Sequence, residues 1–256
     1  MKRVLVTGAN GQLGLALKDA AKGYNIEFIL LDKNSLDITD SEAIKGVFSS
    51  QSLDVCINTA AYTDVGGAEI NRGLAYAINA KAVETLAKVC KQYKCRLVHI
   101  STDYVFDGTF DRPYNPTDTP NPLNVYGASK LAGELAIKAV GGNYSIVRTS
   151  WLYSKYGNNF YTKLQAQLKA GKTLKINDVR QGCPTKAEDL ATYLLNGIFE
   201  GTLADSVSHY CGNKVMTWFK LAKDLFPEYH KIIKSSISVE NPLRPTKVIL
   251  VSQNKY

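Results

Sequence analysis

Residues 4–14 read VLVTGANGQLG, a stretch that gives the strongest indication of the fold. The short apolar run at its start is typical of a buried strand, and the chain then turns into a helix that we expect to end near Lys22. The spacing of Gly8, Gly11 and Gly14 lets backbone amides approach a pyrophosphate at the amino terminus of that helix. It is not the commonest dinucleotide fingerprint, and a glycine-rich turn can also serve only to close a strand onto a helix.

The segments after this turn alternate between strand and helix patterns. A second apolar strand over residues 27–31 ends at Asp32, where a carboxylate can accept hydrogen bonds from an adenosine ribose. Further strands are predicted at residues 54–58, 96–100 and 145–148, with helices at residues 39–50, 74–93 and 125–140. Thr39 and Glu42 predict a capping box for the first of these helices. The alternation specifies an α/β fold with a doubly wound parallel sheet of the Rossmann type.

Residues 151–256 are predicted to form mainly a substrate-binding region, with some segments returning to the dinucleotide-binding Rossmann domain of residues 1–150. Helices are expected at residues 160–170, 187–200 and 217–225, and strands near residues 174–176 and 208–211. Aromatic and amide groups gather at residues 149–153 and 157–160, and these groups suit a sugar and a base. Trp151 fits a buried core equally well.

The composition is that of an ordinary globular protein of 256 residues, long enough for a sizeable core. The net charge of +8 would help to attract an anionic nucleotide, but no long basic run points to nucleic acid. The five cysteines lack metal-binding spacing and indicate reduced thiols in a cytoplasm. No apolar run is long enough for a signal peptide or a membrane span. We therefore predict a cytoplasmic protein with no nucleic-acid and no membrane partner.

Two polar residues at mid-chain, Tyr126 and Lys130, stand four positions apart at the start of the helix predicted over residues 125–140. Both side chains should therefore share one helical face. Thr102 follows the apolar strand at residues 96–100, at the carboxyl end where open α/β sheets place their ligands. A lone tyrosine–lysine pair of this spacing is common on helix surfaces, so its surroundings must support a functional interpretation.

These three residue types suit the transfer of a proton to a carbonyl group. An ammonium near a phenol favours the phenolate, so Lys130 is expected to lower the pKa of Tyr126 from its usual value of about 10. Tyr126 would then give a proton to a carbonyl oxygen as a hydride reaches the carbon. Thr102 would donate a hydrogen bond to the developing alkoxide.

Several motifs resemble the extended short-chain dehydrogenase/reductases and, within them, the dTDP-4-dehydrorhamnose reductases. The resemblance covers nearly the whole chain and rests on residues 8–14, 58–63, 101–108, 121–130, 148–151, 157–160, 181–185 and 244–245. It implies hydride transfer from NADPH or NADH to the 4-keto group of dTDP-4-dehydro-6-deoxy-L-mannose. By this resemblance, Thr102, Tyr126 and Lys130 are the catalytic triad.

The resemblance also implies binding roles for individual residues. The cofactor would be bound by Gly8, Gly11, Gln12, Leu13, Gly14, Asp32, Asp37, Ile38, Ala60, Ala61, Tyr62, Tyr126 and Lys130. The nucleotide-sugar substrate would be bound by Thr63, Asp103, Tyr104, Trp151, Gln181 and Arg244. Arg244 is the best candidate to hold the pyrophosphate, since a planar guanidinium binds phosphate oxygens bidentately. Homodimers are common in the family, and no metal site is expected, because no carboxylates are spaced to form one.

Three departures from the family pattern affect these roles. Where relatives usually have Val-Asp-Lys-Ala-Glu, this chain has VGGAE, so Gly66 and Gly67 replace an acid and a base beside the expected active site. We expect altered catalysis or a mobile loop there. Val251 follows Leu250 where relatives have an Asp, and the chain stops at Tyr256, before a last helix that many relatives carry.

Two other functions are open to this scaffold. A nucleotide-sugar dehydratase or epimerase would use the same triad, but dehydratases of this group resemble Thr-Asp-Glu at the strand end, and here Tyr104 follows Asp103. A non-catalytic cofactor-binding subunit, similar to the regulatory partner of methionine adenosyltransferase, is favoured by Gly66 and Gly67 and opposed by the intact triad.

Overall fold

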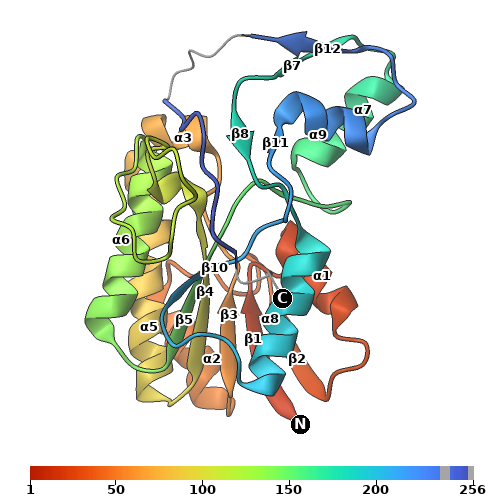
Figure 1. Ribbon diagram of the computed structural model, residues 1–256. Helices are drawn as coiled ribbons and strands as arrows, with labels where there is room; N and C mark the ends of the chain where they lie inside the picture. The colour runs from red at the N-terminus through yellow and green to blue at the C-terminus, as the bar shows by residue number, and fades with distance from the viewer. Residues whose placement is uncertain (237–242, 253–256) are drawn as a thin grey trace.

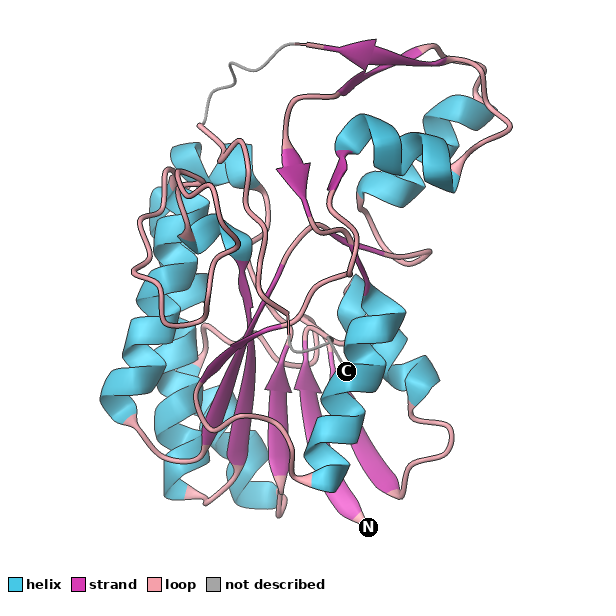
Figure 2. Cartoon of the chain, viewed as in Figure 1, coloured by secondary structure: helices cyan, strands magenta, loops and turns pink. Residues whose placement is uncertain are grey.

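A six-stranded parallel sheet forms the centre of the computed structural model, which describes residues 1–236 and 243–252 (Figures 1 and 2). In order across the sheet, the strands are β10 (Val207–His209), β5 (Tyr144–Thr149), β4 (Arg96–Thr102), β3 (Val55–Asn58), β1 (Lys2–Thr7) and β2 (Ile26–Leu31). The order reverses at β1, because β2 lies on one side of it and β3 on the other. Open α/β sheets bind ligands at such a reversal, outside the carboxyl ends of the strands. The doubly wound α/β fold predicted from the sequence is confirmed.

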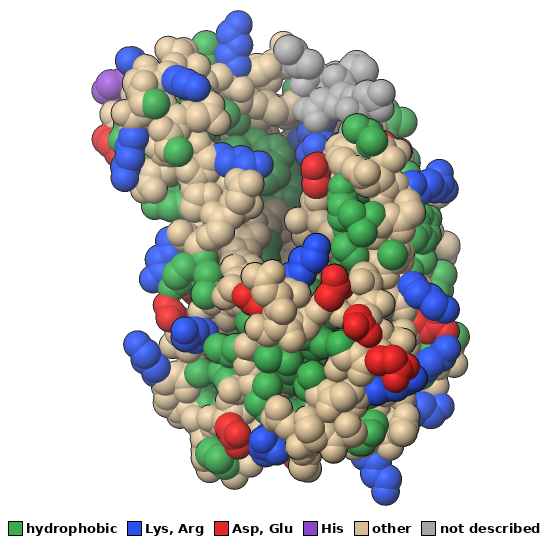
Figure 3. Space-filling view, turned by 180° about the vertical axis from the view of Figure 1, so that it is seen from behind, with side chains coloured by type: hydrophobic (Ala, Val, Ile, Leu, Met, Phe, Trp, Pro, Cys, Tyr) green, Lys and Arg blue, Asp and Glu red, His purple; other side chains and the backbone are tan. Residues whose placement is uncertain are grey.

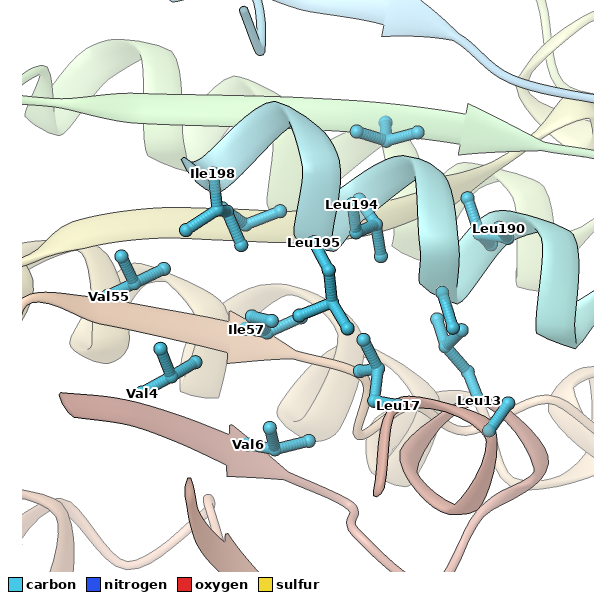
Figure 4. Close-up of a cluster of buried hydrophobic side chains, with 14 of the residues drawn as sticks. Val4, Val6, Leu13, Leu17, Val55, Ile57, Leu190, Leu194, Leu195 and Ile198 are labelled. Carbon is cyan, nitrogen blue, oxygen red and sulfur yellow. The ribbon is translucent and has the colours of Figure 1, made fainter. Parts of the chain in front are cut away.

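Helices cover both faces of this sheet. One face carries α2 (Ser41–Ser50), α5 (Ala82–Gln92) and α6 (Val125–Val140), and the other carries α1 (Gln12–Ala20) and α8 (Ala187–Glu200). Successive residues of β1 point to opposite layers. Val4 and Val6 pack toward α1 and α8 (Figure 4), whereas Leu5 packs toward α2 and α5. The strand is buried on both faces, which explains why its sequence is a continuous apolar run.

The second region lies beyond the carboxyl ends of the strands and contains α7 (Phe160–Lys169) and α9 (Trp218–Leu225) (Figure 2). Three small sheets pair β7 (Leu174–Asn177) with β12 (Ile232–Ser235), β8 (Gln181–Gly182) with β11 (Met216–Thr217), and β6 (Leu152–Tyr153) with β9 (Thr185–Lys186). Its own apolar cluster joins α7 to α9 through side chains that include Leu164, Leu168 and Phe226. Within the described residues, no helix is long and apolar enough to cross a membrane.

The start of α2 differs from the sequence prediction. The side chain of Asp40 accepts hydrogen bonds from the amides of Glu42 and Ala43, so Asp40 is the N-cap. The hydroxyl of Thr39 instead donates to Asp37 at 2.7 Å. The predicted capping box between Thr39 and Glu42 is therefore wrong, because a carboxylate one residue later fits the exposed helix amides better.

The helix predicted over residues 74–93 is also interrupted. It comprises the end of α4 (Arg72–Tyr76), a π-helical turn (Ala77–Lys81) and α5. The wider turn contains Asn79, which accepts from the amide of Tyr62 at 2.9 Å and donates to its carbonyl oxygen at 3.0 Å. Such π turns often occur at functional sites. This one fixes the loop that follows β3. Tyr256, the last residue of the chain, lies outside the described residues.

Candidate active site

A cleft of about 620 Å³ opens above the carboxyl ends of β1, β3 and β4, between the sheet and the second region (Figure 3). The predicted site residues that line it are Gly8, Gly11, Gln12, Leu13, Asp32, Asp37, Ile38, Ala60, Ala61, Thr63, Thr102, Asp103, Tyr104, Tyr126, Lys130 and Trp151. The predicted residues outside its lining are Gly14, Tyr62, Gln181 and Arg244. A second hollow, of about 640 Å³ between α5 and α6, contains none of them.

The lining also includes Thr149, Leu152, Gly157 and Asn158, from the two segments that were expected to suit a sugar and a base. Other lining residues were not predicted individually as site residues: Asn10, Leu36, Thr59, Val65, Ile78, Ile100, Ser101 and Trp218. Several stand at or just after the carboxyl end of a strand, so the strand-end rule applied to every strand would have found them. Trp218 begins an amphipathic helix, and no local signal separates it from a core residue.

Close contacts shape the glycine loop. Gly8 has a φ of +66°, and a Cβ atom there would lie 2.8 Å from the Cα of Ala60. A Cβ atom on Gly14 would lie 2.5 Å from the carbonyl oxygen of Ala9. Gly8 therefore permits the turn itself, while Gly14 lets α1 pack against the loop from beneath. This packing role explains why Gly14 does not line the cleft.

Asp32 is held by its own turn at the end of β2. Its Oδ1 accepts from the amides of Asn34 and Ser35 and from the Ser35 hydroxyl, and its Oδ2 accepts from Asn10 at 2.5 Å. These bonds, first of all those from Ser35, lower the pKa of Asp32 below 3.8. Lys33 lines the cleft beside it. A carboxylate and an ammonium thus border the place where a ribose is expected.

The three predicted catalytic residues meet at the cleft although they come from two elements. Thr102 ends β4, whereas Tyr126 and Lys130 lie on the first two turns of α6. The hydroxyl of Thr102 lies close enough to Tyr126 to affect its pKa, and it donates to Oδ1 of Asp103 at 3.2 Å. Gly127 allows α6 to approach β4 closely, since a Cβ atom there would lie 2.2 Å from the carbonyl oxygen of Tyr104. The rings of Tyr104 and Tyr126 meet edge to face with centroids 5.6 Å apart.

Lys130 is almost completely buried, with 2% of its surface exposed. Its Nζ donates to the carbonyl oxygen of Ile100 at 2.7 Å and lies 3.2 Å from Nε2 of His99. Burial lowers the pKa of Lys130 to about 8, and the carboxylate of Glu134 opposes this. Glu134 in turn accepts two hydrogen bonds from Arg148, at 2.9 and 2.6 Å. Lys130 therefore lies near a buried ion pair between Glu134 of its own helix and Arg148 of β5.

The pKa of Tyr126 does not follow the sequence expectation. Burial raises it above 10.0, and the nearby hydroxyl of Thr102 opposes that rise. The ammonium of Lys130 points to Ile100 and His99, and it is not the dominant influence on Tyr126. The predicted lowering of this pKa is therefore wrong. Tyr126 keeps its proton at neutral pH, as a proton donor must.

Asp103 and Tyr104 follow Thr102 in a 3₁₀ turn (Asp103–Val105). Burial raises the pKa of Asp103 to about 7, although its hydrogen bond with Thr102 opposes the rise. Burial also raises the pKa of Tyr104, whereas Arg244, through its charge and a hydrogen bond, and the charge of Arg180 both act to lower it. Two guanidinium groups therefore lie near the Tyr104 hydroxyl. Arg180 was not predicted, because its local sequence resembles that of a surface arginine.

Trp151 and Trp218 form an aromatic stack at the second region's side of the cleft. Their ring centroids are 3.7 Å apart and their planes differ by 5°. Trp151 has a φ of +46°, a conformation that costs free energy for a bulky residue. A Cβ atom on Gly182 would lie 2.5 Å from the Trp151 ring. Gln181 precedes that glycine in β8, outside the lining of the cleft.

Gly66 and Gly67 belong to a helix, α3 (Val65–Ile70), so the expectation of a mobile loop is wrong. The side chain of Asp64 caps this helix and accepts from the amide of Gly67 at 3.0 Å. A Cβ atom on Gly67 would lie 2.5 Å from Oδ2 of Asp64 and 2.6 Å from the hydroxyl oxygen of Tyr62. The missing side chain at this position therefore makes room for Tyr62.

These features define a class of protein. A glycine turn between strand and helix, a carboxylate at the end of the next strand, and a Thr–Tyr–Lys set across one cleft form the site of a short-chain dehydrogenase/reductase. The chain belongs to the family described as "RmlD substrate binding domain", which matches residues 1–248.

Named relatives and solved structures lie close to this chain. It is 39% identical over 232 residues to a dTDP-4-dehydrorhamnose reductase of Mycobacterium tuberculosis, covering 89% of this chain and 75% of that protein. It is 40% identical to a dTDP-4-dehydrorhamnose reductase of Burkholderia thailandensis, covering 99% of this chain and 86% of that protein. The crystal structure of a dTDP-4-dehydrorhamnose reductase from Bacillus anthracis, in complex with NADP, superposes with a TM-score of 0.90 at 36% identity, covering 98% of this chain and 90% of that one.

Proposed function

We propose that this protein reduces the 4-keto group of dTDP-4-dehydro-6-deoxy-L-mannose with NADPH or NADH, forming dTDP-L-rhamnose for polysaccharide or glycan biosynthesis. The observation that carries this proposal is that Thr102, Tyr126 and Lys130 meet in the same cleft as the glycine turn. The names of the relatives at 39% and 40% identity support the same reaction.

The cofactor side of the cleft fits a dinucleotide. Gly8 and Gly11 leave the backbone at the amino terminus of α1 open to a pyrophosphate. Asp32 is held by a hydrogen bond from Asn10, and its carboxylate lies where it can accept hydrogen bonds from an adenosine ribose. Asp37 and Ile38 line the cleft on the same side. We assign Ala60, Ala61 and Tyr62 to the middle of the cofactor site. The bound dinucleotide supplies the hydride.

The chain's own residues manage the proton. Tyr126, whose phenol is held protonated by burial, gives its proton to the keto oxygen. The hydroxyl of Thr102, which donates to Oδ1 of Asp103 in the structure, turns to donate to the same oxygen as negative charge develops there. Lys130 stabilises the phenolate that remains and is held at one end by Ile100. The proton donor Tyr126 and the hydrogen-bond donor Thr102 thus hold the keto oxygen in position before the reaction begins.

We assign the nucleotide-sugar to the side of the cleft formed by the second region. Trp151 presents an aromatic face there, and Thr63, Asp103 and Tyr104 present polar groups. Arg244 and Gln181 lie outside the present lining, and Arg244 reaches the Tyr104 hydroxyl. Its guanidinium suits the diphosphate of the substrate, since it can bind two phosphate oxygens at once.

The direct test is to incubate the purified protein with NADPH or NADH and the 4-keto nucleotide sugar. We expect one reduced cofactor to be consumed for each dTDP-L-rhamnose formed, with the stereochemistry read by NMR. A dehydratase or epimerase would change the sugar without net consumption of reduced cofactor. A cofactor-binding subunit would bind the dinucleotide, with an affinity measurable by calorimetry, and leave the sugar unchanged.

Cofactor preference is set at Asp32 and Lys33. A carboxylate accepts from a ribose 2′-hydroxyl and repels a 2′-phosphate, whereas an ammonium attracts the phosphate. We expect both cofactors to work, and Asp32→Ala should shift kcat/KM toward NADPH by about tenfold, roughly 1.4 kcal/mol. Lys33→Ala should shift it the other way. If the ratio of kcat/KM for NADPH to that for NADH is unchanged in both variants, the 2′ position of the adenosine ribose does not lie beside Asp32 and Lys33.

We also propose that the protein works as a homodimer in a reducing cytoplasm. All five cysteines are buried free thiols, which suits such a compartment.

A further inference from the structure

Behind the catalytic lysine, a chain of buried polar side chains crosses three strands of the sheet. The hydroxyl of Thr7 lies 2.6 Å from Oδ1 of Asn58, and Nδ2 of Asn58 lies 3.0 Å from Nδ1 of His99. Nε2 of His99 lies 3.2 Å from Nζ of Lys130. All four residues are at most 2% exposed. Burying such groups is costly unless each donor meets an acceptor, so the proton positions in this chain depend on one another.

The contacts of Lys130 fix the direction of its ammonium group. An ammonium has three N–H donors and no acceptor. The carbonyl oxygen of Ile100 takes one donor and Nε2 of His99 is placed to take a second, which directs the third toward the cleft. For as long as Lys130 is an ammonium, His99 must therefore be neutral, with its lone pair on Nε2 and its proton on Nδ1. Its complete burial and the nearby lysine charge both disfavour an imidazolium.

Asn58 determines which tautomer His99 adopts. With Nδ2 of Asn58 facing Nδ1 of His99, that nitrogen is an acceptor, and the ring proton on Nε2 faces Lys130. Only a neutral amine can accept that proton. With the Asn58 amide turned over, its oxygen faces Nδ1 of His99, and Nε2 is free to accept from an ammonium. Turning the amide exchanges oxygen and nitrogen in nearly the same positions. The network thus has one hydrogen-bonded state for each charge state of Lys130.

We propose that His99 is a positioning residue that holds Lys130, and that its tautomer, set by the orientation of Asn58, changes with the charge of the lysine. The inference rests on the proposed function only in giving Lys130 its catalytic role. It predicts that neither His99 nor Asn58 touches the substrate or the reacting atoms.

Other charged groups face this network and must be kept constant in any test. Along α6, Glu134 lies next to Lys130 and favours its charged form, and Arg148 of β5 binds Glu134. Asp103, after β4, lies near Tyr126 rather than near His99. The variants below leave these groups unchanged.

The first experiment compares the pH dependence of kcat in two variants of His99. His99→Leu removes the group that accepts a hydrogen bond from the Lys130 ammonium. The alkaline limb of the kcat profile should therefore move to lower pH by about one unit, because a hydrogen bond to a charged group contributes free energy on that scale. His99→Gln can present a side-chain oxygen to Lys130 and should recover at least half of that shift. KM for the dinucleotide should change less than threefold, roughly, in both variants.

A matched control is His209→Leu, which removes another fully buried histidine, on β10, separated from β4 by β5. His209 is influenced by Arg148 and does not contact Lys130. This variant should be less stable in thermal unfolding, while the alkaline limb of its kcat profile stays at the same pH. A shift of equal size in His209→Leu, or no shift in His99→Leu, would overturn the proposal.

The second experiment needs no turnover. The chain has three histidines, so a ¹⁵N-histidine spectrum is simple, and His99→Gln identifies the His99 signals. Below about pH 8, where Lys130 is charged, His99 should carry its proton on Nδ1, and above it on Nε2. An imidazolium, or a proton on Nε2 throughout, would contradict the proposal. A protein with no reductase activity but with this tautomer change would overturn the proposed function and leave the inference standing.

Discussion

Three ionisable side chains, the buried Asp103 and Lys130 and the half-buried Tyr126, lie together where β4 ends and α6 begins. Burial favours the neutral form of each: it raises the pKa of Asp103 to about 7, raises that of Tyr126, and lowers that of Lys130 to about 8. The pKa values of Asp103 and Lys130 therefore lie close to neutral pH, and Tyr126 keeps its proton there. Such perturbed groups gathered in a cleft are typical of catalytic sites.

Tyr126→Phe tests the proton donor. The variant lacks the hydroxyl that protonates the keto oxygen, so kcat should fall by about 100-fold or more, while dinucleotide binding should change little. Tyr144→Phe, which alters a half-buried tyrosine outside the cleft lining, is the control and should keep full activity. Steady-state kinetics and a cofactor titration measure both effects. Full turnover in Tyr126→Phe would remove Tyr126 from the mechanism.

Asp103 should make stability depend on pH. Its pKa is 3.8 in the unfolded chain and about 7 when folded, so between these values the folded state binds a proton that the unfolded state has released. The free energy of unfolding should therefore fall as pH rises from about 4 to 7, by up to about 4 kcal/mol. Asp103→Asn should lose this dependence. Urea unfolding across this range would show parallel curves for the two proteins if the inference were wrong.

The glycines of α3 illustrate how an element depends on single positions. In Gly66→Ala the new methyl group has space, with Asp64 Oδ1 at 3.7 Å, so helix propensity should stabilise the fold by about 0.5–1 kcal/mol. In Gly67→Ala the methyl group meets Asp64 and Tyr62 at 2.5 and 2.6 Å, and we expect a loss of about 1–3 kcal/mol. Urea unfolding of the matched pair measures both. Equal effects would mean that Tyr62 moves freely.

At the same level, the sequence located elements better than their ends and interruptions. The segments predicted from local apolar runs lie within a few residues of the observed elements. The short helix α3 and the strands β6, β8, β9, β11 and β12 were not predicted. The N-cap at Asp40 and the π turn at Asn79 were missed, because each depends on a hydrogen bond that other nearby residues could also have made. The wider turn at Asn79 is stabilised by the hydrogen bonds of its side chain with the backbone of Tyr62, which belongs to a different loop.

The cleft depends on the whole molecule, since its two sides come from distant segments. Arg244→Ala should raise KM for the dTDP-sugar at least tenfold, because a charge-assisted bond contributes about 1.5–3 kcal/mol, and should leave the affinity for NADH nearly unchanged. Arg112→Ala removes an arginine that pairs with Asp118 outside the cleft lining and should change neither value. If Arg244→Ala leaves KM unchanged, Arg180 is the next candidate for the diphosphate.

Local patterns were sufficient for the parallel sheet, the glycine turn and the shared face of Tyr126 and Lys130. Each follows from neighbours a few positions apart, through side-chain alternation or helical spacing. Tertiary packing determined the rest. It stacked Trp218 on Trp151, brought Arg180 to Tyr104, and raised the pKa of Tyr126 where sequence predicted a fall. The physical reason is that desolvation depends on everything packed around a group, whereas the sequence reveals only the charge that stands four residues away.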